Sequence, residues 1–232
     1  MLETGKITNP SGFQTIHFLE TDLVLLSEKA IWVKDFQALL ISDLHFGKAA
    51  HFRKSGIPIP EPIHYSDLQV IEGLIKKWAP TAIFFLGDLF HSDWNGQWEV
   101  LIQFMERFAQ IKFHLVKGNH DILPSAFYTN TPLKIHLETF RLGSLLLSHE
   151  PFPKVEPEMI NICGHIHPGI LLRGKARQHV RIPCFHFDGK TLIMPAFGNF
   201  TGLALVKPES GHWIWGIAQE KVIPILSGTA IG

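Results

Sequence analysis

Clusters of polar residues follow apolar, strand-like runs at five places in this 232-residue chain. The clusters are Asp43-Leu44-His45, Gly87-Asp88, Gly118-Asn119-His120-Asp121, Ser148-His149 and Gly164-His165-Ile166-His167. In layered α/β folds, ligands bind outside the carboxyl ends of the strands, where loops from separated segments converge. We therefore expect the five clusters to meet at one edge of a sheet.

Periodicity predicts an α/β fold made of one domain over residues 1–232. Apolar runs bounded by turn residues predict strands over 16–18, 23–26, 30–33, 38–41, 81–86, 111–116, 144–147, 180–187, 190–194, 203–206 and 213–217. Helical spacing predicts a helix over 66–78, with Ser66 as its cap and Pro80 beyond its end, and a second helix over 98–109. No repeat or linker divides the chain.

Composition limits the classes of protein to which this chain could belong. A hydrophobic content of 46% predicts a compact chain, and no apolar stretch is long enough to cross a bilayer. Because the first residues also lack the pattern of a secretory signal, we expect a soluble cytoplasmic protein. The two cysteines, Cys163 and Cys184, are expected to be buried free thiols, and 21 basic residues balance 21 acidic ones, so any nucleic-acid affinity must be local.

The residue types in the clusters indicate a metal site with two ions. Asp43 and His45 are two residues apart, which on a strand end points both side chains to one face. A carboxylate such as Asp88 can bridge two cations. The candidate metal ligands are Asp43, His45, Asp88, Asn119, His149, His165 and His167. Nitrogen and oxygen ligands without thiolate favour manganese, with iron or zinc as alternatives. Taken alone, His149 is equally well explained as a core histidine with a satisfied hydrogen bond.

The order of these motifs resembles that of the calcineurin-like metallophosphoesterases. The resemblance implies a four-layer α/β/β/α sandwich. It also implies one metal on Asp43, His45, Asp88 and His167, and a second metal on Asp88, Asn119, His149 and His165.

Longer matches resemble one branch, the bacterial ligase-associated DNA damage response endonucleases. They cover residues 42–54, 56–60, 87–92, 148–151, 163–168 and 195–202. That branch implies association with an ATP-dependent DNA ligase and a helicase. Protein serine/threonine phosphatases are disfavoured, because His91 and Asp121 stand where they carry Asp and Glu. His91 instead is similar to a histidine that lies near the substrate phosphate in double-strand-break repair nucleases.

The expected chemistry is phosphodiester hydrolysis. Two cations would share a water, lower its pKa and aim the resulting bridging hydroxide at phosphorus. His120, next to Asn119, is the expected proton donor to the leaving oxygen. Asp121 is expected either to orient His120 or to cap a helix.

The substrate is less constrained than the chemistry. Two sets of basic residues are candidate phosphate contacts: Lys48, His51, Arg53 and Lys54, and then Arg173, Lys175, Arg177, His179 and Arg181. The second set recurs at every other position, which on one strand would form a basic stripe, although a solvated strand edge explains it equally well. Phe197 is a candidate for stacking on a base or for packing under the site. DNA is therefore the first expectation for the substrate. A small-molecule phosphodiesterase or nucleotidase and a non-catalytic scaffold are the alternatives.

Overall fold

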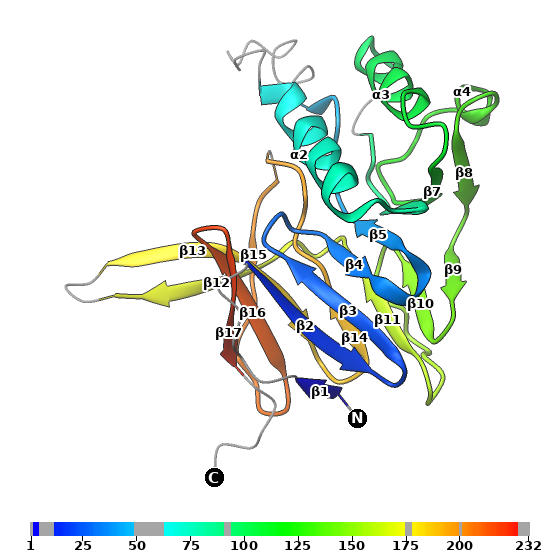
Figure 1. Ribbon diagram of the computed structural model, residues 1–232. Helices are drawn as coiled ribbons and strands as arrows, with labels where there is room; N and C mark the ends of the chain where they lie inside the picture. Colours follow the sequence, from blue (N-terminus) through cyan, green and yellow to red (C-terminus); the bar gives the residue numbers. More distant parts are fainter. Residues whose placement is uncertain are drawn as a thin grey trace.

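Two β-sheets pack face to face, and helices cover the outer face of the first sheet (Figure 1). The computed structural model describes residues 2–4, 12–48, 63–90, 94–174, 178–199 and 201–226. None of the helices in these ranges is both long and apolar enough to span a membrane.

Among the described residues, the first sheet has eight strands in sequence order. They are β1 (Leu2–Thr4), β2 (Phe13–Phe18), β3 (Thr21–Leu26), β4 (Ile31–Val33), β5 (Ala38–Ile41), β6 (Ala82–Leu86), β7 (Lys112–Val116) and β8 (Leu133–His136). Neighbours from β1 to β5 are antiparallel, whereas β5 to β8 run parallel. The accompanying helices are the 3-10 helix η1 (Lys34–Phe36), α2 (Ile63–Trp78), α3 (Gln97–Glu106) and α4 (Ser125–Tyr128).

The second sheet has nine strands in the part of the chain that the structure describes. They are β9 (Thr139–Leu142), β10 (Leu145–Ser148), β11 (Ile160–Cys163), β12 (Pro168–Arg173), β13 (His179–Phe187), β14 (Thr191–Ile193), β15 (Ala204–Leu205), β16 (Trp213–Ala218) and β17 (Lys221–Leu226). β10, β11 and β14 are parallel neighbours, and β12 and β13 form an antiparallel hairpin.

Alternation along the first sheet builds two cores. In β3, Val24 and Leu26 belong to the cluster that α2 and α3 cover, whereas Leu23 and Leu25 face the second sheet. Helix α2 contributes Leu68, Ile71 and Leu74, spaced so that they form one apolar stripe. Burying a side chain of this size contributes about 1.5–3 kcal/mol relative to leaving it exposed.

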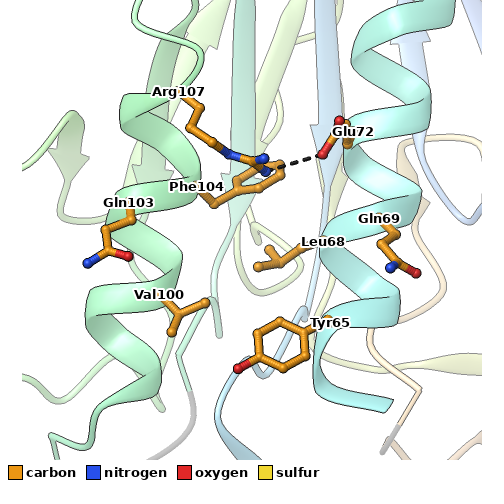
Figure 2. A pocket seen from close by; sticks show the side chains of 8 residues that line it. All are labelled: Tyr65, Leu68, Gln69, Glu72, Val100, Gln103, Phe104 and Arg107. Atoms are coloured by element: carbon orange, nitrogen blue, oxygen red, sulfur yellow. Dashed lines mark hydrogen bonds and ion pairs between the residues drawn. The ribbon is translucent and has the colours of Figure 1, made fainter. Parts of the chain in front are cut away.

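A groove of about 430 Å³ runs between α2 and α3 (Figure 2). Tyr65 and Val100 lie toward one end, and Arg107 donates a hydrogen bond of 3.2 Å to Glu72 at the other. None of the predicted metal ligands lines this groove. The chemistry predicted from the sequence therefore belongs elsewhere.

The predicted α/β fold is confirmed, with a difference from the four layers that the resemblance implies. The described residues after α4 form no helix, so the outer face of the second sheet has no helical layer among them. A small cluster of Ile170, Ile182, Cys184 and Ile214 lies on that sheet instead. The expected buried free thiols are confirmed for both cysteines.

Two local predictions were wrong. Helix α2 begins at Ile63, so Ser66 lies inside the helix and does not cap it. The basic residues from Arg173 to Arg181 do not share one strand, because β12 ends at Arg173 and β13 begins at His179. Arg173 pairs with His179 across the hairpin, which places these two and Arg181 on one face. Lys175 and Arg177 lie outside the described residues.

Candidate metal centre

The predicted ligands come together where strands of both sheets end. Asp43, Asp88 and Asn119 follow β5, β6 and β7, and His149 and His165 follow β10 and β11. The pairing of β5 with β6 continues past the strands, because the N–H of His45 donates to the carbonyl of Asp88 at 2.8 Å. The first two motifs therefore lie side by side.

Asp43 belongs to two groups of side chains with the geometry of a metal site. One group is Asp43, His45 and His167, and the other is Asp43, Asp88 and His149; the ligand atoms within each lie within 4.8 Å of one another. His167 Nε2 lies 3.2 Å from Asp43 Oδ1, and His45 Nε2 lies 3.7 Å from Asp88 Oδ2. Asp43 is completely buried and Asp88 is 2% exposed. The arrangement is consistent with a binuclear centre.

The ring of His149 is oriented so that its Nε2 atom faces polar atoms of three other residues. Its Nδ1 lies 3.1 Å from the carbonyl of Leu86, a contact that requires the proton on Nδ1. In the neutral ring, Nε2 then has no proton. That atom lies 2.9 Å from Asn119 Oδ1, 3.1 Å from His165 Nδ1 and 3.5 Å from Asp88 Oδ1. A cation among these atoms would be bound by the Nε2 lone pair together with the oxygens of Asn119 and Asp88.

The spacings also fit coordination chemistry. Nitrogen and oxygen atoms about 2.0–2.2 Å from one ion, at tetrahedral or octahedral angles, are about 3.0–3.5 Å apart. The separations of Asp43 from His167 and of His149 from Asp88 are 3.2 and 3.5 Å. Among the described residues, the buried Nε2 of His167 also has no hydrogen-bond partner. The residues present therefore fit the metals that the sequence implies.

Strained backbone gathers at these motifs. Five of the predicted ligands have positive φ angles, namely Asp43 (52°), His45 (48°), Asp88 (49°), His165 (66°) and His167 (52°). Residues other than glycine rarely adopt this region, and such residues cluster at functional sites. Left-handed backbone therefore places the side chains of Asp43 and His45 in the site. The sequence had suggested an extended strand end instead.

Glycines in the motifs make room for ligands from other motifs. A Cβ atom at Gly118 would lie 2.4 Å from Asp88 Oδ1, and one at Gly164 would lie 2.2 Å from Asp43 Oδ2. Real Cβ atoms essentially never approach so closely. Each carboxylate can therefore occupy its place only because the neighbouring motif carries no side chain there.

Asp121 joins two of the loops. Its carboxylate accepts N–H groups from Gly118 at 2.8 Å, Leu89 at 3.0 Å and Phe90 at 3.3 Å. Burial, above all, raises the pKa of Asp121 to about 6. Asp121 is not a helix cap, because α4 begins at Ser125. Its contacts fix the second motif against the third.

The remaining candidates have different positions. His120 is exposed, its ring centroid is 5.7 Å from that of His45, and its N–H donates to Asp88 Oδ1 at 2.9 Å. Lys48 is half-buried, and its pKa is lowered by burial while Asp88 counteracts the shift. Phe197 is 2% exposed and packs in the core, so it offers no face to a base. His51, His91, Arg53 and Lys54 lie outside the described residues.

No pattern in the sequence predicted a polar network beneath the first motif. Lys29 Nζ donates to the carbonyl of Phe197, and Asn199 Nδ2 donates to Asp67 Oδ1 at 2.6 Å. The N–H of Gly198 donates in turn to the carbonyl of Asp43 at 3.1 Å. The network therefore holds the 195–199 loop against the motif. Glu150 is another residue near the site whose contact the sequence did not predict. Its Oε1 lies 4.0 Å from His165 Nε2.

Asp67 should make stability depend on pH. Burial, more than any other cause, raises its pKa from 3.8 to about 6 although Lys29 opposes the shift. The folded state holds this proton more tightly than the unfolded chain, so the contribution is full below pH 3.8 and is lost as pH rises through about 6. Its size is on the order of 3 kcal/mol.

Urea unfolding measures this contribution of Asp67 to the free energy of unfolding. The wild type and Asp67→Asn are compared from about pH 4 to about 6.5, with chelator in both samples. The variant should become more stable relative to the wild type as pH rises, since it has no carboxyl group to ionise. Parallel curves for the two proteins would show that Asp67 titrates normally.

Comparisons with known proteins agree with this geometry. A family model described as calcineurin-like phosphoesterase matches residues 36–150, which include Asp43, Asp88, Asn119 and His149. No curated protein sequence gives a match.

Among solved structures, nuclease MPE from Pseudomonas putida aligns with a TM-score of 0.75 and 28% identity, over 92% of this chain and 100% of that one. The phosphoesterase Yfce from E. coli aligns with a TM-score of 0.44 and 14% identity, over 80% of this chain and 96% of that one. A predicted phosphoesterase from Streptococcus pneumoniae TIGR4 aligns with a TM-score of 0.35 and 19% identity, over 82% and 93%. From the family match and the fold shared with nuclease MPE, the chain belongs to the calcineurin-like metallophosphoesterases.

Proposed function

We propose that this protein is a binuclear metal-dependent phosphodiesterase that cleaves DNA, with a role in repair. The observation that carries the chemistry is the buried pair Asp43 and Asp88, surrounded by imidazoles whose nitrogens lie 3.2–3.9 Å from the carboxylate oxygens. Buried carboxylates need opposite charge. The similarity to a nuclease along nearly the whole chain supports DNA as the substrate.

Each ion would take its ligands from both sheets. We assign one ion to Asp43, His45, Asp88 and His167, and the other to Asp88, Asn119, His149 and His165. Manganese is the metal we propose, because the ligands are nitrogen and oxygen atoms without thiolate. Two such ions would supply the nucleophile and neutralise the phosphoryl oxygens.

The chain's own residues would handle substrate and protons. His120 is exposed beside the ligands, where its ring can donate a proton to the departing ester oxygen. Lys48, near Asp88, can contact a phosphoryl oxygen. Asp121 would act indirectly, because it holds the loop that carries Asn119 and His120.

One assay tests the substrate. The manganese-loaded protein is given an aryl phosphodiester, cyclic nucleotides, and single-stranded and duplex DNA, at low and high salt. We expect cleavage of DNA that weakens with salt, and Asp88→Asn, purified identically, should cleave none of them. Hydrolysis of small diesters without DNA cleavage would refute the nuclease assignment and favour a small-molecule phosphodiesterase.

The role of His120 has a separate test. His120→Asn should lower kcat on DNA by about 10²–10⁴-fold, the range for losing a general acid. The loss should be much smaller on the aryl diester, because an aryl oxide leaves without a proton. Metal content should remain that of the wild type, whereas Asp88→Asn should lower both metal content and turnover. Equal losses of kcat on both substrates would exclude proton donation.

A further inference from the structure

The hairpin of β12 and β13 extends beyond the body of the second sheet (Figure 1). Its base is anchored, because Ile170 and Ile182 pack in the small cluster on the outer face of that sheet. Beyond the cluster the two strands pair with each other as far as Arg173 and His179. Among the described residues, no third strand pairs with this outer part of the hairpin. Both of its faces are therefore open to a partner.

One face of the outer hairpin is basic. Arg173, His179 and Arg181 share this face, and all three side chains are exposed. Side chains that are opposite each other across an antiparallel pair lie about 4.5–5.5 Å apart, so the three form one patch. The chain has 21 acidic residues, but none occurs between Glu158 and Asp188. We call Arg173, His179 and Arg181 the basic face.

The two arginines of the basic face differ from the other arginines that the structure describes. The other two have carboxylate partners, Arg107 with Glu72 at 3.2 Å and Arg141 with Glu156 at 3.7 Å. Within the described ranges, no carboxylate pairs with either arginine of the basic face. A guanidinium presents a planar fork of N–H donors that matches a carboxylate or a phosphate. These donors are therefore available to an anion from solution.

Strand β12 leads directly away from the proposed metal centre. It begins at Pro168, next to the proposed ligand His167, and ends at Arg173. At about 3.3 Å per residue, Arg173 lies roughly 17 Å along the strand from Pro168. A small phosphodiester bound at the metals cannot span this distance. A polymer with repeated negative charges can contact the metal centre and the basic face at the same time.

We propose that the basic face binds the phosphate backbone of DNA, several nucleotides from the phosphodiester held at the metal centre. This inference rests on the proposed function, because DNA is the substrate proposed there. Contacts from Arg and Lys to phosphates release counterions and fix the position of the nucleic acid without reading its sequence. The formal net charge of the chain is zero, so affinity for DNA requires a local basic surface of this kind.

The test measures affinity for DNA at several salt concentrations. Binding of a fluorophore-labelled oligonucleotide is followed by anisotropy. The parent protein is manganese-loaded His120→Asn, which should cleave the DNA slowly. Each phosphate contact contributes about 0.7–0.9 to the slope of log affinity against log salt. Between about 50 and 200 mM salt, the affinity of the parent should therefore fall about 2.5- to 3.5-fold more than that of Arg173→Gln or Arg181→Gln. The difference from the double variant should be about 7- to 12-fold.

Two further variants control the comparison. Arg141→Gln removes the same charge from an exposed arginine on β9, the opposite edge of the second sheet, and should keep the salt slope of the parent. Arg173→Lys keeps the positive charge and should also keep most of the slope. Thermal unfolding should give the same Tm for all variants, since the substituted side chains are exposed.

The outcomes separate this inference from the proposed function. If the parent binds DNA and the double variant has the same salt slope, the basic face is refuted and the proposed function stands. An equal loss of slope in Arg141→Gln would also refute the basic face, because net charge alone would then explain the effect. If the variants lower the slope but the wild type cleaves no DNA, the proposed function fails and the basic face remains a surface that binds DNA. Absence of DNA binding by the parent would overturn both.

Discussion

Replacing Asp43 by Asn should lower phosphodiester hydrolysis on the order of 10³-fold, because groups that stabilise charge in the transition state have effects of this size. Asp43 is completely buried, and it belongs both to the group with His45 and His167 and to the group with Asp88 and His149. Its carboxylate also accepts the N–H of His165 at 3.0 Å, so it orients a second motif. Asn keeps the shape of the side chain and removes the charge, so metal content should fall together with turnover.

The same substitution should stabilise the metal-free protein. Asp43 and Asp88 are two buried carboxylates in one site, and without cations their charges disfavour folding. Thermal unfolding with chelator should therefore give a higher Tm for Asp43→Asn than for the wild type, and added Mn²⁺ should raise the Tm of the wild type alone. Asp35→Asn, an exposed carboxylate change, is the control. Wild-type turnover and full metal content in Asp43→Asn would exclude the proposed centre.

Gly164→Ala should disrupt the centre although it adds only a methyl group. The new Cβ would lie 2.2 Å from Asp43 Oδ2 and 2.7 Å from Ser42 Cβ, and both atoms are buried. We expect a loss of about 1–3 kcal/mol in the free energy of unfolding, as for other overpacked sites. Because Asp43 must move, hydrolysis and metal content should fall as well.

Gly73→Ala provides the matched control for this change. Apart from its chain neighbours and the backbone of its own helix, no atom lies within 4 Å of a Cβ built at Gly73, which is exposed in the middle of α2. Alanine should stabilise the helix by about 0.5–1 kcal/mol and leave activity unchanged. Urea unfolding and an assay of both variants measure the contrast. Equal effects of the two substitutions would show that the close approach at Gly164 has no consequence.

Local patterns predicted the elements that carry the site. The runs before Asp43 and Asp88 are continuous apolar segments that form the strands β5 and β6, whereas the run before Asn119, which forms β7, also contains Lys112 and His114. A parallel sheet covered on both faces requires such runs, so the periodicity was informative. The convergence of the five motifs follows from this arrangement.

Features that depend on distant contacts could not be predicted. Lys29 and Asp67 lie in different elements, and only the packed chain shows that they are close. The end of β12 at Arg173 and the start of β13 at His179 were missed because alternating basic residues suggested one continuous strand. Left-handed backbone at Asp43 and His45 was missed as well, since a positive φ is uncommon even for Asp and His, the non-glycine types that adopt it more often than most.

The proposed ligands are divided between the two sheets by chemical type. Loops of the first sheet supply both carboxylates, the Asn119 amide and a single imidazole, His45, whereas loops of the second supply His149, His165 and His167. The first sheet alone would supply two carboxylates but only one imidazole. The second sheet alone would supply three imidazoles but no carboxylate. A metal ion bound by this protein would therefore link the two sheets. Tight metal binding would then require that the two sheets are packed against each other.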